Sequence, residues 1–338
     1  MHLSVGSLPL TGGGVLPEVT LAYASYGTLN ARGDNAVLVT HGLTSGHGML
    51  EAAGATEGSW ADLLRPGRAL DAGRYFVVCS NVVGSSFGST GPASPRPGGR
   101  TPWGADFPAL SVSDMVLAQR RLLERLGVRH LQLVIGPSFG GMQALQWALD
   151  HPDRVSAVAS VVSGIHWPRT HGSAALLRNF EADPNWQGGR YPIGSMRACM
   201  RRLRLETLRS YGMERVLQDR MGAADAAARL DEAAARWAQV FDPHSLLRLQ
   251  SAGERFEVAG QLERIRCPVL FVPASSDRVF PPDPEVRSTM HRALGERLVW
   301  RELQTPYGHL ASGLEIAQWE PDLRQLLRQT LTSEGIHS

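Results

Sequence analysis

The chain has 338 residues, of which 43% are hydrophobic and 20% charged, and its formal net charge is +2. This composition excludes a disordered or fibrous protein, and the length permits a buried core without disulfides or a structural metal. All 34 basic residues are arginine, which excludes a lysine Schiff base or a lysine general base. A net charge this close to zero argues against a nucleic-acid-binding protein.

Cysteine usage and hydropathy restrict the class of protein further. Cys79, Cys199 and Cys267 are too few and too scattered for a disulfide framework or a zinc site, so we expect no metal. No run approaches the roughly 18 apolar residues of a membrane span. Residues 1–19 lack the basic region and long apolar run of a signal peptide. We therefore expect a cytoplasmic protein that contacts no membrane.

Strand and helix patterns alternate along the first half of the chain. Residues 18–28 alternate in polarity, which predicts an antiparallel edge strand. Helices are expected at 113–126, with Ser113 as N-cap, and at 140–149. Continuous β-branched apolar runs, typical of strands covered on both faces, occupy residues 35–41, 75–81, 130–136, 155–164, 268–274 and 298–304. The order predicts an α/β fold with a mainly parallel sheet and helices on both faces.

The character of the sequence changes between residues 166 and 255. Strand patterns give way to arginine, alanine, methionine and tryptophan in helical spacing. We expect a helical insertion here, called the lid below. The predicted core is then split into residues 1–165 and 256–338.

A G-x-S-x-G sequence surrounds Ser138, directly between a predicted strand and a predicted helix. This is the context of a nucleophile elbow, in which a tight turn exposes the serine hydroxyl above the sheet. The motif alone is weak, but its placement between strand and helix makes it specific. We therefore predict that Ser138 is a catalytic nucleophile.

Such a serine needs an acid and a histidine that follow it in the order Ser, Asp or Glu, His. Asp277 stands just after the predicted strand 268–274, and His309 lies in the loop after the next one. The carboxyl ends of strands are where open α/β sheets place their sites. We predict that Asp277 and His309 complete a catalytic triad, although either residue alone would be read as an ordinary surface-loop residue.

An oxyanion hole is predicted from two backbone N–H groups. One belongs to Phe139, the residue after the nucleophile, and the other to Leu43, in the loop that follows an earlier strand. His41 precedes that loop, and we expect it to shape the loop and not to act as a second base.

Eight segments together resemble the homoserine O-acetyltransferase family, which includes serine and homoserine O-succinyltransferase relatives, within the α/β-hydrolase superfamily. The resemblance covers nearly the whole chain and is specific to the family, not only to the fold. It rests on HGLT (41–44), NVVGSSFGSTGP (81–92), DFPALSVSDMVLAQRRLLERLG (106–127), GPSFGGMQALQWA (136–148), DPNWQGGRY (183–191), FDPHSLLRL (241–249), SDRVFPP (276–282) and YGH (307–309).

The resemblance implies further site residues. Arg201 aligns with an arginine that binds the substrate carboxylate, although an arginine in this run could equally face solvent. Leu310 stands where the family usually has an aspartate for the substrate amino group, and Leu208 stands where a pocket tyrosine is usual. Family members often form dimers through the lid, so the resemblance implies a homodimer, with packing inside one chain as the alternative for the lid helices.

The implied reaction is ping-pong transfer of an acetyl or succinyl group from acyl-CoA to a small hydroxyl acceptor, homoserine by family default. Acyl-CoA is then a substrate, and no cofactor is needed. A substrate ammonium beside Leu310 would lose its hydration without gaining a partner, which argues against homoserine. The alternative is a carboxylic-ester hydrolase with the same triad and water as acceptor. A non-enzymatic binding protein is the third hypothesis, and the complete Ser138, Asp277 and His309 set argues against it.

Overall fold

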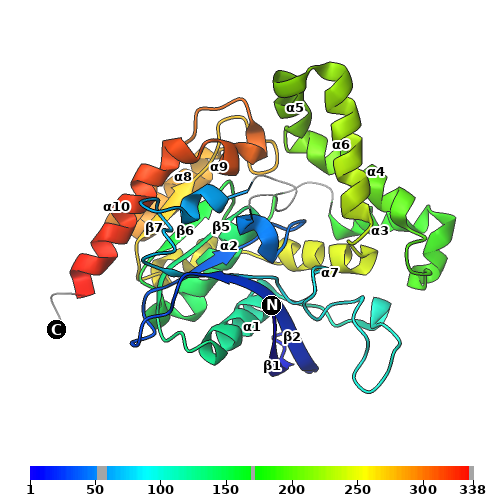
Figure 1. The fold of residues 1–338 in the computed structure, drawn as a ribbon, viewed down its shortest axis with the longest axis horizontal. Helices are drawn as coiled ribbons and strands as arrows, with labels where there is room; N and C mark the ends of the chain where they lie inside the picture. Colours follow the sequence, from blue (N-terminus) through cyan, green and yellow to red (C-terminus); the bar gives the residue numbers. More distant parts are fainter. Residues whose placement is uncertain (52–58, 169–171, 335–338) are drawn as a thin grey trace.

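The structure, a computed structural model, describes residues 1–51, 59–168 and 172–334. It confirms the α/β fold, with an eight-stranded sheet in the order β1-β2-β4-β3-β5-β6-β7-β8 (Figure 1). Strands β4, β3 and β5 to β8 pair in parallel, whereas β1, β2 and β4 pair antiparallel. The strands are β1 (His2–Pro9), β2 (Val15–Tyr26), β3 (Ala36–Thr40), β4 (Phe76–Ser80), β5 (Leu131–Pro137), β6 (Val158–Val161), β7 (Val269–Val272) and β8 (Leu298–Trp300).

The central strands are apolar on both faces because helices cover both sides of the sheet. Neighbouring residues of β3 belong to different clusters of the core: Leu38 packs with α1 and α2 on one face, and Val37 with α10 on the other. The main helices are α1 (Val112–Arg125), α2 (Phe139–Asp150), α3 (Ser173–Glu181), α4 (Arg197–Ser210), α5 (Met213–Met221), α6 (Ala223–Ala238), α7 (Pro243–Glu254), α8 (Pro284–Leu294), α9 (Ala311–Leu314) and α10 (Ile316–Glu334).

The predicted edge strand was wrong in its position. β2 is antiparallel as expected, but it pairs with β1 on one side and β4 on the other, so β1 forms the edge of the sheet. The sequence signal of β1 is weak because Gly6, with φ of 76°, interrupts its register, and the strand ends at Pro9. An irregular edge of this kind also discourages pairing with other chains.

The N-cap of helix α1 lies two residues earlier than predicted. Its N-cap is Ser111, not Ser113: the Ser111 hydroxyl accepts from the backbone N–H of Asp114, whose carboxylate accepts from the N–H of Ser111. This reciprocal capping box satisfies two N–H groups at the helix end, whereas a cap at Ser113 would satisfy at most one. The acid three residues after Ser111 decides the start of the helix.

The lid occupies the chain between β6 and β7, where α3 to α7 follow one another (Figure 1). In Figure 1, α4, α5 and α6 gather to one side of the sheet, opposite α10. Helices α5 and α6 both pack against α4. Within the described residues, no helix combines the length and apolar character needed to cross a lipid bilayer.

Candidate active site

The nucleophile elbow lies between β5 and α2. Ser138 has φ of 55°, a left-handed conformation that a residue with a side chain adopts at a cost and that is typical of this turn. A Cβ atom on either Gly136 or Gly140 would lie 2.3 Å from the carbonyl oxygen of Thr40, so both positions must be glycine. The turn is therefore held in its strained shape by close packing against the end of β3.

Hydrogen bonds fix the backbone of the elbow to the neighbouring strand. The N–H of Ser138 donates to the carbonyl of Val161 at 2.9 Å, and the Ser163 hydroxyl donates to the carbonyl of Ser138 at 2.6 Å. Ser138 itself stands at the N-terminal end of α2, whose twelve residues present a partial positive charge there. This environment favours negative charge beside the serine side chain.

Asp277 and His309 lie together, as expected from the chain order. The Nδ1–H of His309 donates to Oδ2 of Asp277 at 2.8 Å, and the other oxygen of Asp277 accepts from the N–H of Val279 at 2.8 Å. Both side chains are buried. Since Nδ1 carries the proton in this bond, Nε2 is the basic nitrogen of the neutral imidazole.

The two segments of the predicted oxyanion hole follow β3 and β5. Phe139 is the first residue of α2, and Leu43 lies in the loop after β3, packed against the core. His41 is fully buried: its Nε2 accepts from the N–H of Val82 at 3.0 Å, and its Nδ1 lies 2.8 Å from the carbonyl of Gly42. Both ring nitrogens are engaged, so the role expected for His41 as a loop-shaping residue fits its contacts.

The surroundings of His309 are aromatic and apolar. The ring of Tyr211 lies 4.7 Å from the His309 ring between centroids, and the ring of Phe280 lies 5.9 Å from it. Leu310 is only 2% exposed and packs with Tyr211 and Val216. The histidine is therefore shielded from water by the lid on one side and the core on the other.

A buried arginine of the lid, Arg204, lies close to these groups. It is 1% exposed, its Nη1 donates to the Thr44 hydroxyl at 2.8 Å, and its guanidinium carbon is 5.1 Å from the centroid of the Trp237 ring. The same carbon is 6.0 Å from the ring of Tyr211, which itself contacts His309. A guanidinium in this position can hold a carboxylate near the reacting groups.

The position of Arg201 contradicts the substrate contact predicted for it. Its side chain is 48% exposed, and its guanidinium forms a two-point ion pair with Asp231 on α6. The physical reason is what packs against each side chain: Arg201 meets Asp231 of α6 at the surface, whereas Arg204, one turn further along, is buried against Thr44 and Trp237.

Comparisons with known proteins agree with the fold and show the family. The family model described as "alpha/beta hydrolase fold" matches residues 35–303. A homoserine O-acetyltransferase of Trichormus variabilis is 38% identical over 333 residues, which cover 94% of this chain and 90% of that relative. The chain belongs to the homoserine O-acetyltransferase family. Membership confirms the predicted family and the prediction of an enzyme of the acyltransferase type.

Solved structures show the same fold in proteins of another name. The crystal structure of esterase E22 superposes with a TM-score of 0.85 at 24% identity, covering 97% of this chain and 99% of that one. The acetyl esterase MekB gives a TM-score of 0.81 at 27% identity, covering 97% of this chain and 96% of that one. The likeness to E22 shows the fold alone, and the fold of this acyltransferase family also occurs in esterases.

The second departure from the family pattern, Leu208, lies between lid helices. It is buried with Leu230 and Ala234, so it packs α4 against α6. From the lid, the aromatic side chain of Tyr211 contacts His309. Leu310, in contrast, packs beside Tyr211.

Sequence reasoning thus missed Arg204 and Tyr211, although a signal was present. Met200, Arg204, Leu208 and Tyr211 recur at spacings of four, four and three, which places them on one helical face, and all four are buried. Arg201 borders this stripe at the surface, where it pairs with Asp231. An arginine that shares the apolar stripe of an amphipathic helix is the one expected to be buried and bound.

The cysteines offer no competing nucleophile in this family member. All three are free thiols and buried. Burial raises the pKa of the thiols of Cys79 and Cys199, and it raises that of Cys267 to about 12. A thiol with a raised pKa carries little of the reactive thiolate at neutral pH. Within the described residues, no group of histidine, cysteine and acidic side chains is arranged to hold a metal ion.

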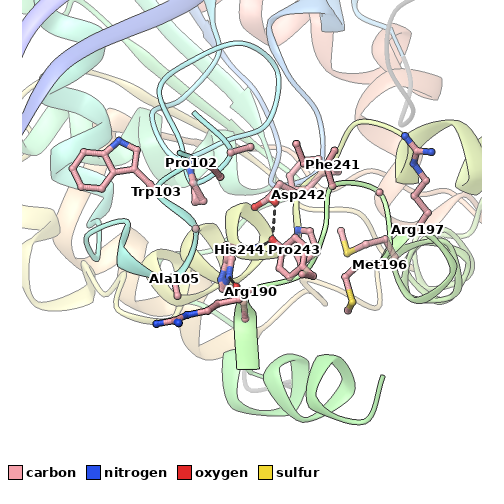
Figure 2. A pocket seen from close by; sticks show the side chains of 18 of the residues that line it. Pro102, Trp103, Ala105, Arg190, Met196, Arg197, Phe241, Asp242, Pro243 and His244 are labelled. Atoms are coloured by element: carbon pink, nitrogen blue, oxygen red, sulfur yellow. Dashed lines mark hydrogen bonds between the residues drawn. The ribbon is translucent and has the colours of Figure 1, made fainter. Parts of the chain in front are cut away.

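A separate cavity of about 700 Å³ lies between the lid and the loop around Trp103 (Figure 2). None of the residues that line it belongs to the predicted triad or oxyanion hole. Its polar groups bond to one another: Tyr191 donates to Asp242 at 2.7 Å, and His244 Nε2 lies 2.7 Å from the carbonyl of Gly189. Both contacts lie within the lid, where they hold the segment around Tyr191 against the start of α7, and nothing in them resembles acyl-transfer chemistry.

Proposed function

We propose that the enzyme transfers an acetyl or succinyl group from acyl-CoA to the hydroxyl of a small amino-acid acceptor, with Ser138 as nucleophile. Homoserine is the default acceptor because the relatives carry that name. The observation that carries the proposal is Arg204, which lies buried beside Tyr211 and therefore near His309. A guanidinium there supports recognition of an acceptor carboxylate. Acyl-CoA acts as a substrate, and no cofactor takes part.

The proposed mechanism has two half-reactions. In the first, Nε2 of His309 takes the proton of the Ser138 hydroxyl while the oxygen attacks the thioester carbonyl. The oxyanion accepts hydrogen bonds from the N–H groups of Leu43 and Phe139. The carbon–sulfur bond breaks, and CoA leaves with the proton from His309. In the second, the acceptor hydroxyl gives its proton to His309 while its oxygen attacks the acyl carbonyl. The ester bond to Ser138 then breaks, and His309 returns the proton to the Ser138 oxygen, which regenerates the enzyme.

Asp277 holds His309 in the tautomer that this mechanism needs, because it accepts the Nδ1 proton at 2.8 Å. It also stabilises the imidazolium that forms when His309 holds both protons. The burial of both side chains strengthens this interaction by keeping water away.

The second candidate function is hydrolysis of carboxylic esters with the same nucleophile. Leu310 favours it, because an apolar side chain packed against Tyr211 offers nothing to an acceptor ammonium group. The likeness to the acetyl esterase MekB supports the same candidate. Water would then replace the amino acid in the second half-reaction.

Two assays on one preparation distinguish these functions. One measures CoA release from acetyl-CoA and succinyl-CoA with and without homoserine or serine. The other measures hydrolysis of short-chain p-nitrophenyl esters. The transferase proposal predicts acceptor-dependent CoA release. Rapid ester hydrolysis that no acceptor alters, together with acceptor-independent CoA release, would establish the hydrolase instead.

Leu310→Asp is expected to raise kcat/KM for homoserine by about 10-fold to 100-fold, the worth of one charge-assisted hydrogen bond to the acceptor ammonium. The matched control is Leu310→Asn, which has the same shape without the charge and is expected to give a much smaller gain. Thermal unfolding of both variants shows whether the buried polar group disturbs the fold. An equal gain with asparagine, or none with aspartate, would contradict the acceptor pocket.

Arg204→Met is expected to lower kcat/KM for an amino-acid acceptor by about 100-fold, because a buried charge pair with the carboxylate is lost. Hydrolysis of p-nitrophenyl acetate, which has no carboxylate, should change much less. Arg201→Met is the matched control on the same helix and should leave both activities within about twofold, since its ion pair with Asp231 is at the surface. Equal losses in the two variants would rule out a specific contact at Arg204.

A homodimer through the lid and a cytoplasmic location both stay predictions. Three large apolar side chains of the lid are exposed, namely Ile193, Met221 and Val240. Ile193 and Val240 line the same cavity, so they can form one apolar patch, and such a patch supports an interaction of the lid with a second copy.

A further inference from the structure

Three polar side chains outside the proposed reaction form a buried hydrogen-bond chain between α1 and α2. The indole N–H of Trp147 donates to Oε1 of Gln119 at 2.7 Å, and Nε2 of Gln119 donates to Oε1 of Gln143 at 2.7 Å. Gln119 and Gln143 are fully buried, and Trp147 is 1% exposed. Burying amide groups costs free energy unless each one forms hydrogen bonds. We therefore ask what these three hydrogen-bonded side chains do in the fold.

The direction of this chain is fixed by its first member. An indole N–H can only donate, so the Gln119 side chain must turn its oxygen to Trp147 and its NH₂ group to Gln143. Gln143 must then accept through its oxygen, which leaves its NH₂ group to donate elsewhere. The two amide orientations therefore follow from Trp147 and need no further assumption.

The NH₂ group of Gln143 reaches both segments of the predicted oxyanion hole. It donates to the carbonyl of His41 at 3.2 Å and to the carbonyl of Phe139 at 3.2 Å. Phe139 supplies one predicted oxyanion donor, and His41 stands two residues before Leu43, which supplies the other. One side chain thus bridges two segments that lie about a hundred residues apart in the sequence.

We propose that Gln143 is a positioning residue that holds the Leu43 and Phe139 segments at the separation an oxyanion needs, with Gln119 and Trp147 fixing its orientation. Donors in such a hole act only when they lie about 2.7–3.1 Å from the developing oxyanion. A displacement of about 1 Å can lower a rate by about 100-fold. Gln143 touches neither substrate nor Ser138 in this arrangement, and it acts through the backbone of the two loops.

The inference rests on Ser138 as nucleophile but not on the identity of the acyl donor or acceptor. An acyltransferase and an ester hydrolase form the same tetrahedral oxyanion, so both need the same hole. Ester hydrolysis or CoA release can therefore report on it equally well. Its failure is also distinguishable from failure of the proposed function, because that function is judged on the wild-type enzyme.

The decisive variant is Gln143→Met, which keeps the volume of the side chain and removes both donated hydrogen bonds. We expect kcat to fall by about 10-fold to 100-fold while KM stays within about threefold, since the hole acts on the transition state and not on the bound substrate. Affinity for a boronic acid, which forms a tetrahedral adduct with the serine, should fall by a similar factor. A merely structural residue would not couple these two losses.

Gln146→Met is the matched control. Gln146 lies on the same helix, but its side chain bonds to Asp150 at the surface, so the variant should keep kcat, KM and boronate affinity. Gln119→Met is the second variant, for use if Gln143→Met does not fold. It leaves the bonds of Gln143 to the loops intact but removes the partner that orients them, and we expect a kcat loss of about 3-fold to 10-fold at unchanged KM.

The proposal is overturned if folded Gln143→Met keeps kcat and boronate affinity within about threefold of the wild type. It is also overturned if KM rises while kcat is unchanged, or if Gln146→Met loses as much as Gln143→Met. Should Gln143→Met fail to fold, an unchanged kcat in Gln119→Met overturns it, and the expected loss at constant KM supports it.

Discussion

Replacing Ser138 with alanine is expected to lower kcat for both acyl transfer and ester hydrolysis by about 10⁵-fold to 10⁶-fold, as loss of the nucleophile does in serine enzymes that use a triad. Alanine retains the elbow, because the left-handed turn is held by the packing of Gly136 and Gly140 against Thr40 and not by the hydroxyl. The variant should therefore fold and bind substrate normally. Only the covalent step is lost.

The control for this prediction is Ser163→Ala. The Ser163 hydroxyl donates to the carbonyl of Ser138, so the variant disturbs the same turn without removing the nucleophile, and we expect less than a tenfold loss. Intact-protein mass spectrometry after treatment with a fluorophosphonate should show one adduct on the wild type and on Ser163→Ala. An adduct on Ser138→Ala, or retained turnover, would place the nucleophile elsewhere.

Asp277→Asn is expected to lower kcat by about 10⁴-fold without loss of the fold. The structure determines how the new amide would sit. Oδ1 accepts from the N–H of Val279, which can only donate, so the asparagine oxygen must stay there and its NH₂ group must face His309. The NH₂ group donates to Nδ1, which moves the imidazole proton to Nε2. The ring then cannot take the proton of Ser138.

Steady-state kinetics as a function of pH measure this effect, and Asp283→Asn provides the control. Asp283 lies in the same connection after β7 but caps α8 by accepting from the N–H of Glu285. Asparagine caps a helix about as well as aspartate, so Asp283→Asn should leave both the free energy of unfolding and kcat close to those of the wild type. A wild-type kcat in Asp277→Asn at neutral pH would show that His309 is oriented by another group.

The parts of the site that follow β-strands were predictable from the sequence because strand ends determine where their side chains meet. Ser138, Asp277 and His309 each follow an apolar run that could be recognised without a structure, and parallel strands bring those ends to one edge. The elbow glycines gave a second, independent signal, since only glycine fits beside Thr40.

The lid could not be predicted to the same depth because the phase of a helix depends on what packs against it. Three arginines occur within four residues of α4, and the sequence alone does not distinguish which of them contacts the substrate. The packing of α6 and of the loop at Thr44 decides that Arg204 is buried and Arg201 is not. The hydrogen bonds of Gln143 could not be predicted from the sequence either, because they join α1, α2 and the loop after β3.

Because the lid is a single insertion between β6 and β7, its sequence can change without changing the strands of the core. The proposed reacting groups follow strands of the core, whereas Arg204 and Tyr211 lie in α4 and just after it. If the proposed mechanism holds, substitutions in α4 change the choice of acceptor and leave the proposed triad unchanged. One core could then serve several acceptors, each with its own version of the inserted helix.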